Sequence, residues 1–330
     1  MTSGAEKIPG TGRSLVSLEA VEEAAAALEG KVIRTPLLPH PILSRETESE
    51  LRLKCESLQH TGSFKARGAL NFLRSLSREA LEAGVITYSS GNHGQAVAYA
   101  AGIQGVRSVV IMPVTAPTIK RDGARSLGAD VVFEGTTSRE RQERAEEIQA
   151  REGLTMVPPF DDPRIIAGQG TSALEAVRDW PEADTFVVPV GGGGLASGWG
   201  VVVRALRPEA RLVGVEAEGA ASMSASLEAG RPVVLDRIDT IADGLAPVRP
   251  GDLTYHHLQA LFDEVVTVPD PAIREAAREL LRRRKLVVEF SGAASVAAVM
   301  TGAVEVEGRK VVVVLSGGNL DPTLLTELVA

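Results

Sequence analysis

The sequence predicts an α/β fold with two open, mostly parallel twisted sheets flanked by helices. Short β-branched runs alternate with Ala-rich segments of helical periodicity, and such alternation is typical of α/β proteins. Some runs, such as Thr185–Val190, are apolar throughout, which indicates parallel strands buried on both faces. A length of 330 residues favours about two domains.

The elements follow in order from these two periodicities. The expected strands are Leu51–Cys55, Gly84–Tyr88, Ser108–Met112, Asp130–Phe133, Thr185–Val190, Arg211–Glu216 and Lys310–Leu315. Helical patterns between them include Gly91–Ala101, Ile119–Leu127, Arg139–Arg151 and Ala272–Arg284.

Composition narrows the class of protein. Cys55 is the single cysteine, which excludes an intrachain disulfide framework and fits a reducing compartment. The net charge is −8 and the one basic run, Arg282–Lys285, ends a helical pattern, so we expect no nucleic-acid partner. We find neither an export signal at the N-terminus nor an apolar run long enough for a membrane span. The expected location is the cytoplasm.

Polar, glycine-rich segments follow four of the predicted strands: LQHTGSFKARGA, SGNHGQA, GGGGLASG and SGGNLD. In open α/β sheets, ligands bind at the carboxyl ends of the strands. We therefore expect these four loops to converge on one ligand.

The loop Gly191–Gly194 is the clearest anion site. It leaves a buried strand and enters a helix, so its backbone N–H groups suit a phosphate. Leu195 and Ala196 replace the Lys-Ser/Thr of a Walker loop. A dinucleotide fingerprint remains open, because Glu216 follows about 20 residues later, at the distance of a ribose-binding acid.

Lys65 favours a phosphate ligand that reacts with an amine over a dinucleotide. Ser63 is predicted to cap a helix that has Lys65 in its first turn. A positive helix end, with Arg67 nearby, disfavours an ammonium ion. A neutral lysine amine is what Schiff-base chemistry requires.

Six motifs now stand in order: SFKARGA, SSGNHGQAVAYAA, IAGQGT, VPVGGGGLASG, TIADGLA and LSGGN. In this order they resemble fold-type-II enzymes dependent on pyridoxal 5′-phosphate (PLP), specifically the threonine/serine dehydratase and serine racemase family. The resemblance runs from about Val16 to the C-terminus. It implies a tryptophan-synthase-β-like fold, with a large PLP-binding domain (residues 1–75 and 162–330) and a small inserted domain (76–161).

The resemblance assigns roles to individual residues. It implies that Lys65 carries PLP and acts as the base at Cα, and that Asn92 donates to the 3′-oxygen of the ring. The remaining cofactor-binding residues that it implies are Phe64, Gly191, Gly192, Gly193, Gly194, Leu195 and Ser316.

Ser316 carries an implication for the reaction. By similarity it faces the pyridine nitrogen, where an aspartate would keep the ring protonated. A serine hydroxyl does not enforce that protonation, which favours loss of a β-leaving group over transamination.

The loop after Tyr88 is expected to bind the substrate. The resemblance places the α-carboxylate at Ser89, Ser90, Gly91, Asn92 and His93, where a helix begins. Ser90 also matches the second base of the racemases, and we expect His93 to pack within the loop.

Two further sites follow from similarity. Arg139 aligns with an arginine that reaches a second substrate carboxylate, as in 3-hydroxyaspartate, although a solvated arginine at a helix start is the alternative. Glu216 and the carbonyl of Ala220 match ligands of a divalent cation, Mg²⁺ or Ca²⁺. Ser222 replaces an acidic ligand there and is a poorer donor to a hard cation.

The implied activity is PLP-dependent elimination from L-threonine or L-serine, giving a 2-oxo acid and ammonia. Alternatives are a 3-hydroxyaspartate dehydratase, an amino acid racemase, a nicotinamide-dependent dehydrogenase and a ligand sensor without activity. The resemblance also implies a homodimer. Because the chain ends soon after SGGN, we expect no C-terminal regulatory domain.

Overall fold

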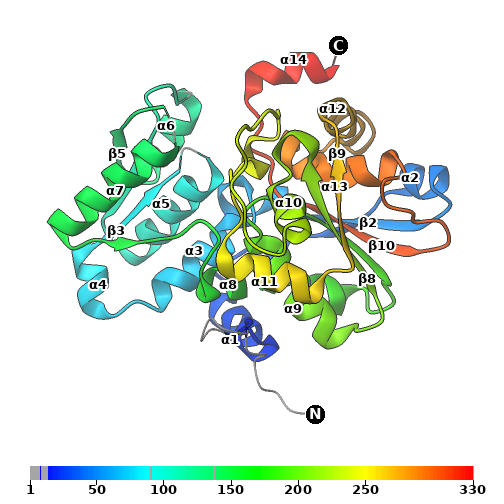
Figure 1. The fold of residues 1–330 in the computed structure, drawn as a ribbon, viewed down its shortest axis with the longest axis horizontal. Helices are drawn as coiled ribbons and strands as arrows, with labels where there is room; N and C mark the ends of the chain where they lie inside the picture. The colour runs from blue at the N-terminus through cyan, green and yellow to red at the C-terminus, as the bar shows by residue number, and fades with distance from the viewer. Residues whose placement is uncertain (1–7, 9–13, 90, 117, 137, 330) are drawn as a thin grey trace.

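The computed structural model describes residues 8, 14–89, 91–116, 118–136 and 138–329. Within them, the strands form a six-stranded and a four-stranded sheet, which lie side by side in Figure 1. The strand pairs in this part of the chain are parallel except for one antiparallel edge pair, β1 with β2. The predicted α/β class is confirmed.

The six-stranded sheet has the order β1-β2-β10-β7-β8-β9. Its strands are β1 (Leu37–Pro39), β2 (Glu50–Cys55), β7 (Thr185–Pro189), β8 (Arg211–Ala217), β9 (Glu264–Val268) and β10 (Lys310–Leu315). The four-stranded sheet has the order β5-β4-β3-β6. Its strands are β3 (Val85–Tyr88), β4 (Ser108–Met112), β5 (Asp130–Phe133) and β6 (Thr155–Met156).

Helices flank both sheets (Figure 1). Those of the first part of the chain are α1 (Leu18–Leu28), α2 (Pro41–Glu46), α3 (Lys65–Arg74), α4 (Arg78–Ala83), α5 (Asn92–Gln104), α6 (Thr118–Ser126) and α7 (Ser138–Glu152). Those of the second part are α8 (Pro163–Asp179), α9 (Gly194–Leu206), α10 (Ser222–Glu228), α11 (Asp252–Leu261), α12 (Asp270–Glu279), α13 (Phe290–Met300) and α14 (Leu325–Val329).

The central strand β10 shows why its sequence is apolar at successive positions. Val312 and Val314 pack into a core shared with α8, α9 and α11. Val311 and Val313 face the opposite way, into a core shared with α12 and α13. Because side chains alternate between the two faces of a strand, a strand covered on both sides has no polar face.

The strands of the four-stranded sheet all come from residues 85–156, inside the range predicted for the small domain. Those of the six-stranded sheet come from the two flanking ranges. Helices α3 and α8 pack against each other, and α3 also contacts α5 of the smaller sheet. The exact domain boundaries stay a prediction.

Some elements differ from the sequence expectation. Strands β1, β6 and β9 were not expected. Strands β1 and β6 are only three and two residues long, which is too short for a periodic pattern. The expected helix Ala272–Arg284 is α12 followed by a π-helical turn at Leu280–Arg284, which ends at Lys285 in the left-handed region, φ 59°.

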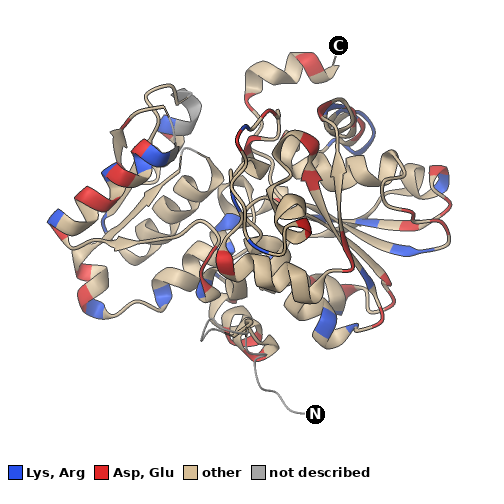
Figure 2. Ribbon diagram, in the orientation of Figure 1, with Lys and Arg blue, Asp and Glu red and all other residues tan. Residues whose placement is uncertain are grey.

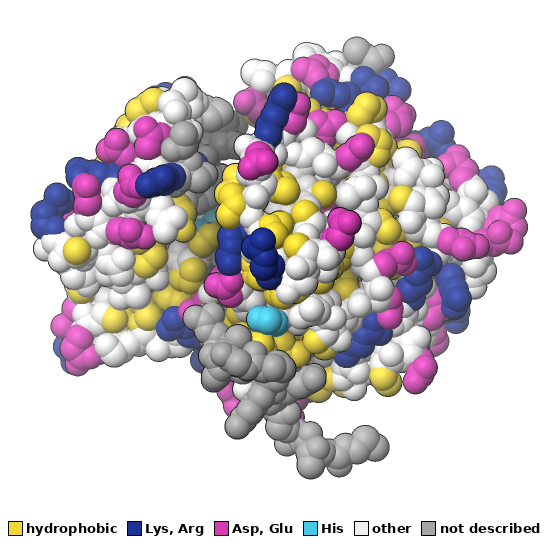
Figure 3. All heavy atoms as spheres, in the orientation of Figure 1, with side chains coloured by type: hydrophobic (Ala, Val, Ile, Leu, Met, Phe, Trp, Pro, Cys, Tyr) yellow, Lys and Arg dark blue, Asp and Glu magenta, His cyan; other side chains and the backbone are white. Residues whose placement is uncertain are grey.

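Charged residues lie mainly at the outer faces and ends of elements, as Figure 2 shows for α7. On the face drawn in Figure 3, cationic and anionic side chains are interspersed. In the part of the chain that is described, no helix combines the length and apolar character that crossing a bilayer requires.

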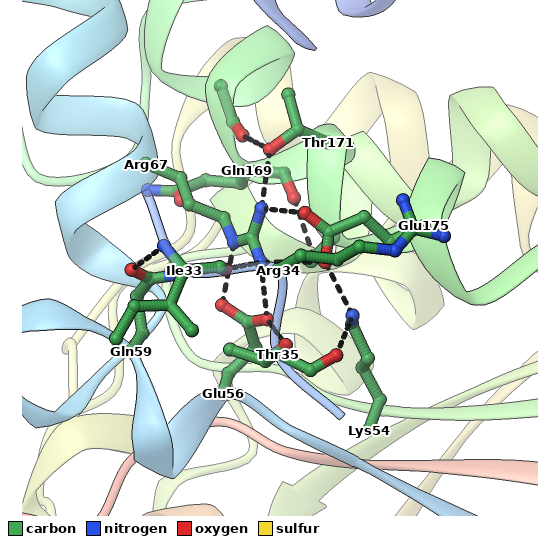
Figure 4. Close-up of polar contacts among 12 residues, drawn as sticks. Ile33, Arg34, Thr35, Lys54, Glu56, Gln59, Arg67, Gln169, Thr171 and Glu175 are labelled. Carbon is green, nitrogen blue, oxygen red and sulfur yellow. Dashed lines mark hydrogen bonds and ion pairs between the residues drawn. The ribbon is translucent and has the colours of Figure 1, made fainter. Parts of the chain in front are cut away.

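A buried ionic network anchors the helix that begins with Lys65 (Figure 4). The guanidinium of Arg67 is 0% exposed and lies between two carboxylates. Its Nε and Nη2 donate to Glu56 at 2.7 and 2.9 Å, and its Nη1 donates to Glu175 at 2.7 Å. Lys54 completes the network, with Nζ 2.5 Å from Glu175 and 2.8 Å from the carbonyl of Thr35.

The network balances two cations with two anions. Burial alone would lower the pKa of Arg67, but Glu56 and Glu175 hold it above its ordinary value. Burial likewise favours neutral Glu56, but Arg67 and Lys54 hold the pKa of Glu56 below its ordinary value. The stabilisation from Glu56 is therefore present above the unfolded pKa of about 4.3 and is lost as pH falls through the lower folded pKa.

Replacing Arg67 by methionine should lower the free energy of unfolding by about 3–5 kcal/mol, because the fully buried carboxylate of Glu56 loses its guanidinium partner and Glu175 keeps only Lys54. Urea unfolding measures this. The control is Arg78→Met, which breaks the exposed i,i+4 pair with Glu82 and should cost less than about 0.5 kcal/mol. Equal losses in both variants would contradict the structural role of the network.

Candidate active site

A cavity of about 410 Å³ lies where the four predicted loops meet. It is lined by residues that follow β2, β3, β7 and β10, so the expected convergence at the strand ends is what the structure shows. The predicted site residues in its lining are Phe64, Lys65, Ser89, Gly91, Asn92, His93, Gly191, Gly192, Gly193, Gly194, Leu195 and Ser316. Ser90 lies outside the described residues.

Lys65 presents its amine to this cavity. Its Nζ donates a hydrogen bond to the carbonyl oxygen of Pro159 at 2.7 Å. Burial lowers the pKa of Lys65 to about 8, and the nearby carboxylate of Glu289 opposes that shift. A substantial fraction of the amine is therefore neutral near physiological pH, as a nucleophile or base requires.

The structure does not support the two causes predicted for the neutral amine of Lys65, a helix capped by Ser63 and the charge of Arg67. Ser63 does not cap α3, because Phe64 is the residue preceding the helix and the Ser63 hydroxyl has no hydrogen-bond partner among the described residues. The charge of Arg67 is held by Glu56 and Glu175. Desolvation, and not a neighbouring cation, lowers the pKa of Lys65.

The glycine loop forms a tightly packed cradle at the start of α9. Gly193 precedes the helix with φ 91°, a conformation that side chains disfavour. A Cβ on Gly192 would lie 2.2 Å from the ring of Phe160, so only glycine fits there. Among the residues with described positions, no side chain caps α9, which leaves its first N–H groups available to an anion.

The helix α5 also begins at the cavity. Its N-cap is Gly91, which has no side chain to satisfy the first N–H groups of the helix. Ser89 Oγ accepts from Gly91 N at 3.3 Å and shapes the turn. A second anion, separate from the one at Gly191–Gly194, fits this helix start.

His93 is held neutral inside this loop. Burial lowers its pKa to about 3, with a further contribution from the charge of Lys65. Its Nε2 lies 3.0 Å from the carbonyl of Val157 and therefore carries the proton. This supports the packing role expected for His93.

Asn92 is held on both sides of its amide. Its Nδ2 donates to Glu289 Oε1 at 2.6 Å, and its Oδ1 accepts from Asn319 Nδ2 at 2.7 Å. No acceptor for the second N–H of the Asn92 amide is found among the described residues, so this group can donate to a ligand.

Glu289 is a site residue to which the sequence assigned no role. It is buried, lines the cavity and lies close enough to Lys65 to raise its pKa. The available signal was a carboxylate placed inside the mostly apolar segment from Val287 to Val299. A charged residue in such a run is rarely buried without a function.

These residues fit PLP. A cradle for one phosphate and a lysine amine with a lowered pKa line the same cavity. Ser316, 5% exposed, lies at the end of β10, and its carbonyl accepts from Phe64 N at 3.1 Å. The loop that carries the lysine is therefore fixed against the loop that carries Ser316.

Arg139 does not line the cavity. Its side chain is 87% exposed and pairs with Glu143 one helical turn later, which is the solvated alternative. Arg141, on the same helix, is half-buried and lines the cavity. The sequence pattern could not separate the two arginines.

Glu216 lies outside the cavity lining and binds the first N–H groups of α10. Its carboxylate accepts from Met223 N at 2.7 Å and from the N and Oγ of Ser224 at 2.8 and 2.7 Å. It is thus engaged at the start of α10 and is not placed to bind a ribose beside Gly191. No group of three or more His, Cys, Asp or Glu residues suited to a metal occurs among the residues that the structure describes, so the cation at Glu216 and Ala220 stays a prediction.

Comparisons with known proteins agree with this chemistry. A family profile described as "Pyridoxal-phosphate dependent enzyme" matches residues 28–317. An L-threonine ammonia-lyase of Thermotoga maritima is 44% identical over 315 residues, which cover 96% of this chain and 78% of that protein.

Solved structures are similar over nearly the whole chain. A threonine deaminase from T.th. has a TM-score of 0.88 at 41% identity, covering 92% of this chain and 99% of that one. Maize serine racemase has a TM-score of 0.91 at 34% identity, covering 94% and 96%.

Capture of PLP by Lys65 should follow the pKa of the lysine. With a pKa of about 8, the rate of capture should rise with pH to half its maximum near pH 8, and not near the value of about 10.4 typical of lysine. Glu289→Gln should shift this midpoint downward, because it removes the charge that favours ammonium. Borohydride trapping of the apoenzyme with PLP at successive pH values measures the rate. Exposed Glu307→Gln is the control, and an unchanged midpoint in Glu289→Gln would contradict the assignment.

Proposed function

The chain belongs to the pyridoxal-phosphate dependent enzyme family, and on that premise we propose that it dehydrates and deaminates L-threonine and L-serine. The products would be the corresponding 2-oxo acid and ammonia. The observation that carries the proposal is the amine of Lys65, whose pKa is lowered to about 8, in the cavity that the Gly191–Gly194 cradle also lines.

The cofactor, when bound, supplies an electron sink that makes the Cα proton of an amino acid acidic. The cradle at the start of α9 would hold its phosphate, and Asn92 would donate to its 3′-oxygen. Ser316 would offer a neutral hydroxyl to the ring nitrogen.

The protein's own residues would then perform three tasks. The N–H groups that begin α5 would bind and orient the substrate carboxylate. Neutral Lys65 would take the proton from Cα. Glu289 would stabilise the ammonium so formed, because its charge favours protonated Lys65.

The choice of elimination rests on Ser316 and on the relatives. Without a carboxylate at the ring nitrogen, negative charge at Cα is stabilised less strongly, and prompt departure of the β-hydroxyl is favoured. The relative from Thermotoga maritima is named for elimination from L-threonine.

A substrate panel on the PLP-loaded enzyme tests the proposal. We expect release of 2-oxo acid and ammonia from L-threonine and L-serine, with D-isomers absent from the recovered substrate. Lys65→Ala should lower the rate of oxo-acid release at least about 10³-fold, because it removes the base and the covalent anchor of the cofactor. Racemisation without oxo-acid release would favour the racemase alternative.

A dicarboxylic substrate, 3-hydroxyaspartate, is the second candidate, because half-buried Arg141 lines the cavity. If Arg141 meets the second carboxylate, Arg141→Gln should lower kcat/KM for threo-3-hydroxyaspartate about tenfold or more, relative to L-threonine. Arg139→Gln is the matched control on the same helix and should leave this ratio unchanged. An equal effect of Arg141→Gln on both substrates would contradict the contact.

We also propose a cytoplasmic homodimer with a large domain (1–75 and 162–330) and a small one (76–161). The family resemblance supports the dimer, and the use of a single, buried cysteine supports the compartment. The four-stranded sheet comes from residues 76–161 and the six-stranded sheet from the two flanking ranges, which supports the division.

A further inference from the structure

The segment 157–162 returns the chain from the smaller sheet to the larger one, and its residues attach to different parts of the site. The carbonyl of Val157 accepts from Thr87 Oγ1 at 3.1 Å and lies 3.0 Å from Nε2 of His93. The carbonyl of Pro159 accepts from Lys65 Nζ. The segment makes these contacts with backbone carbonyl oxygens, so they do not depend on the identity of its side chains.

Phe160 is packed against the glycine loop. A Cβ on Gly192 would lie 2.2 Å from its ring, and one on Gly194 would lie 2.9 Å from its Cβ. The loop therefore has no room to shift toward Phe160, which limits the cradle on one side.

A hydrogen bond from Thr254 also holds this loop. Thr254 is completely buried, and its Oγ1 donates to the carbonyl of Gly192 at 2.6 Å. A Cβ on Gly193 would lie 2.7 Å from Cβ of Thr254. Because Thr254 fixes the carbonyl of Gly192, it also fixes the plane of the peptide that carries the N–H of Gly193.

Asp161 holds Thr254 in place. Its Oδ1 accepts from Leu253 N at 2.9 Å and Thr254 N at 3.1 Å, and its Oδ2 accepts from Asp252 N at 3.2 Å. The carboxylate thus satisfies the first N–H groups of α11. The neighbour of Phe160 in sequence therefore positions the helix whose Thr254 also contacts Gly192.

We infer that Asp161 and Thr254 are positioning residues for the cofactor phosphate, acting through the peptide that joins Gly192 and Gly193. Together with Phe160, which packs against Gly192 and Gly194, they restrict the movement of the cradle. The inference rests on the cofactor placement of the proposed function, in which Gly191–Gly194 hold the phosphate. It does not depend on which amino acid is the substrate.

The test compares PLP with pyridoxal, which lacks the phosphate but reacts with the same lysine. Apoenzyme is titrated with each compound, and the dissociation constant is taken from cofactor absorbance. Thr254→Val keeps the shape of the side chain and removes the hydroxyl, which leaves the Gly192 carbonyl without that donor. We expect the dissociation constant for PLP to rise about tenfold while that for pyridoxal stays unchanged.

Three variants complete the experiment. Thr254→Ser retains the hydroxyl and should restore PLP binding to near the wild-type value. Asp161→Asn removes the acceptor for Asp252 N and should weaken PLP binding without weakening pyridoxal binding, which also tests the inference if Thr254→Val does not fold. Thr301→Val deletes a hydroxyl-to-carbonyl bond to Ala297 in α13, outside the cavity lining, and should leave both constants unchanged.

The outcomes separate this inference from the proposed function. Equal PLP affinity in wild type, Thr254→Val and Asp161→Asn overturns the inference alone. An equal loss of affinity for PLP and pyridoxal also overturns it, because the damage would not be specific to the phosphate. Failure of the wild-type protein to bind PLP overturns both proposals.

Discussion

The burial of Arg67 is the constraint on which the rest of the site depends. An unpaired guanidinium in that position would be prohibitively costly, so Glu56 and Glu175 must lie against it, and Lys54 must accompany Glu175. These partners come from β2, the turn that follows it, and α8, so one charge fixes the relative positions of three segments (Figure 4). Lys65 lies two residues before Arg67, at the start of the same helix. The contacts that fix Arg67 therefore also fix the backbone of Lys65.

Periodicity in the sequence was sufficient for the fold class, most strands and the four strand-end loops, because a parallel sheet buried on both faces leaves continuous apolar runs. The convergence of SFKARGA, SGNHGQA, GGGG and SGGN followed from the rule that parallel strands share their carboxyl edge. Strands β1 and β6 were not predicted, because runs of three and two residues are too short to show the alternation that identifies a strand.

What the sequence could not supply was the identity of partners distant in the chain. Neighbours in sequence predict that Ser63 caps α3 and that Arg67 acts as a cation beside Lys65. Both predictions are wrong, because Phe64 precedes the helix and distant Glu56 and Glu175 hold Arg67. Glu289 reaches the site from 197 residues beyond its partner Asn92. Two arginines of α7, at positions 139 and 141, are only two residues apart, yet on a helix that spacing turns them to different faces, and only the second lines the cavity.

The positions of Pro159 and Glu289 show how one lysine can serve in two protonation states. The carbonyl of Pro159 accepts a hydrogen bond from the amine of Lys65, and both the neutral and the protonated amine can donate it. Glu289 favours the ammonium, and burial favours the amine, and the outcome is a pKa of about 8. A lysine with that pKa can accept a proton from carbon and later release it at modest cost in either direction. Stronger burial would disfavour proton uptake, and a closer carboxylate would disfavour proton release, so the catalytic competence of Lys65 depends on keeping these two opposing influences nearly matched.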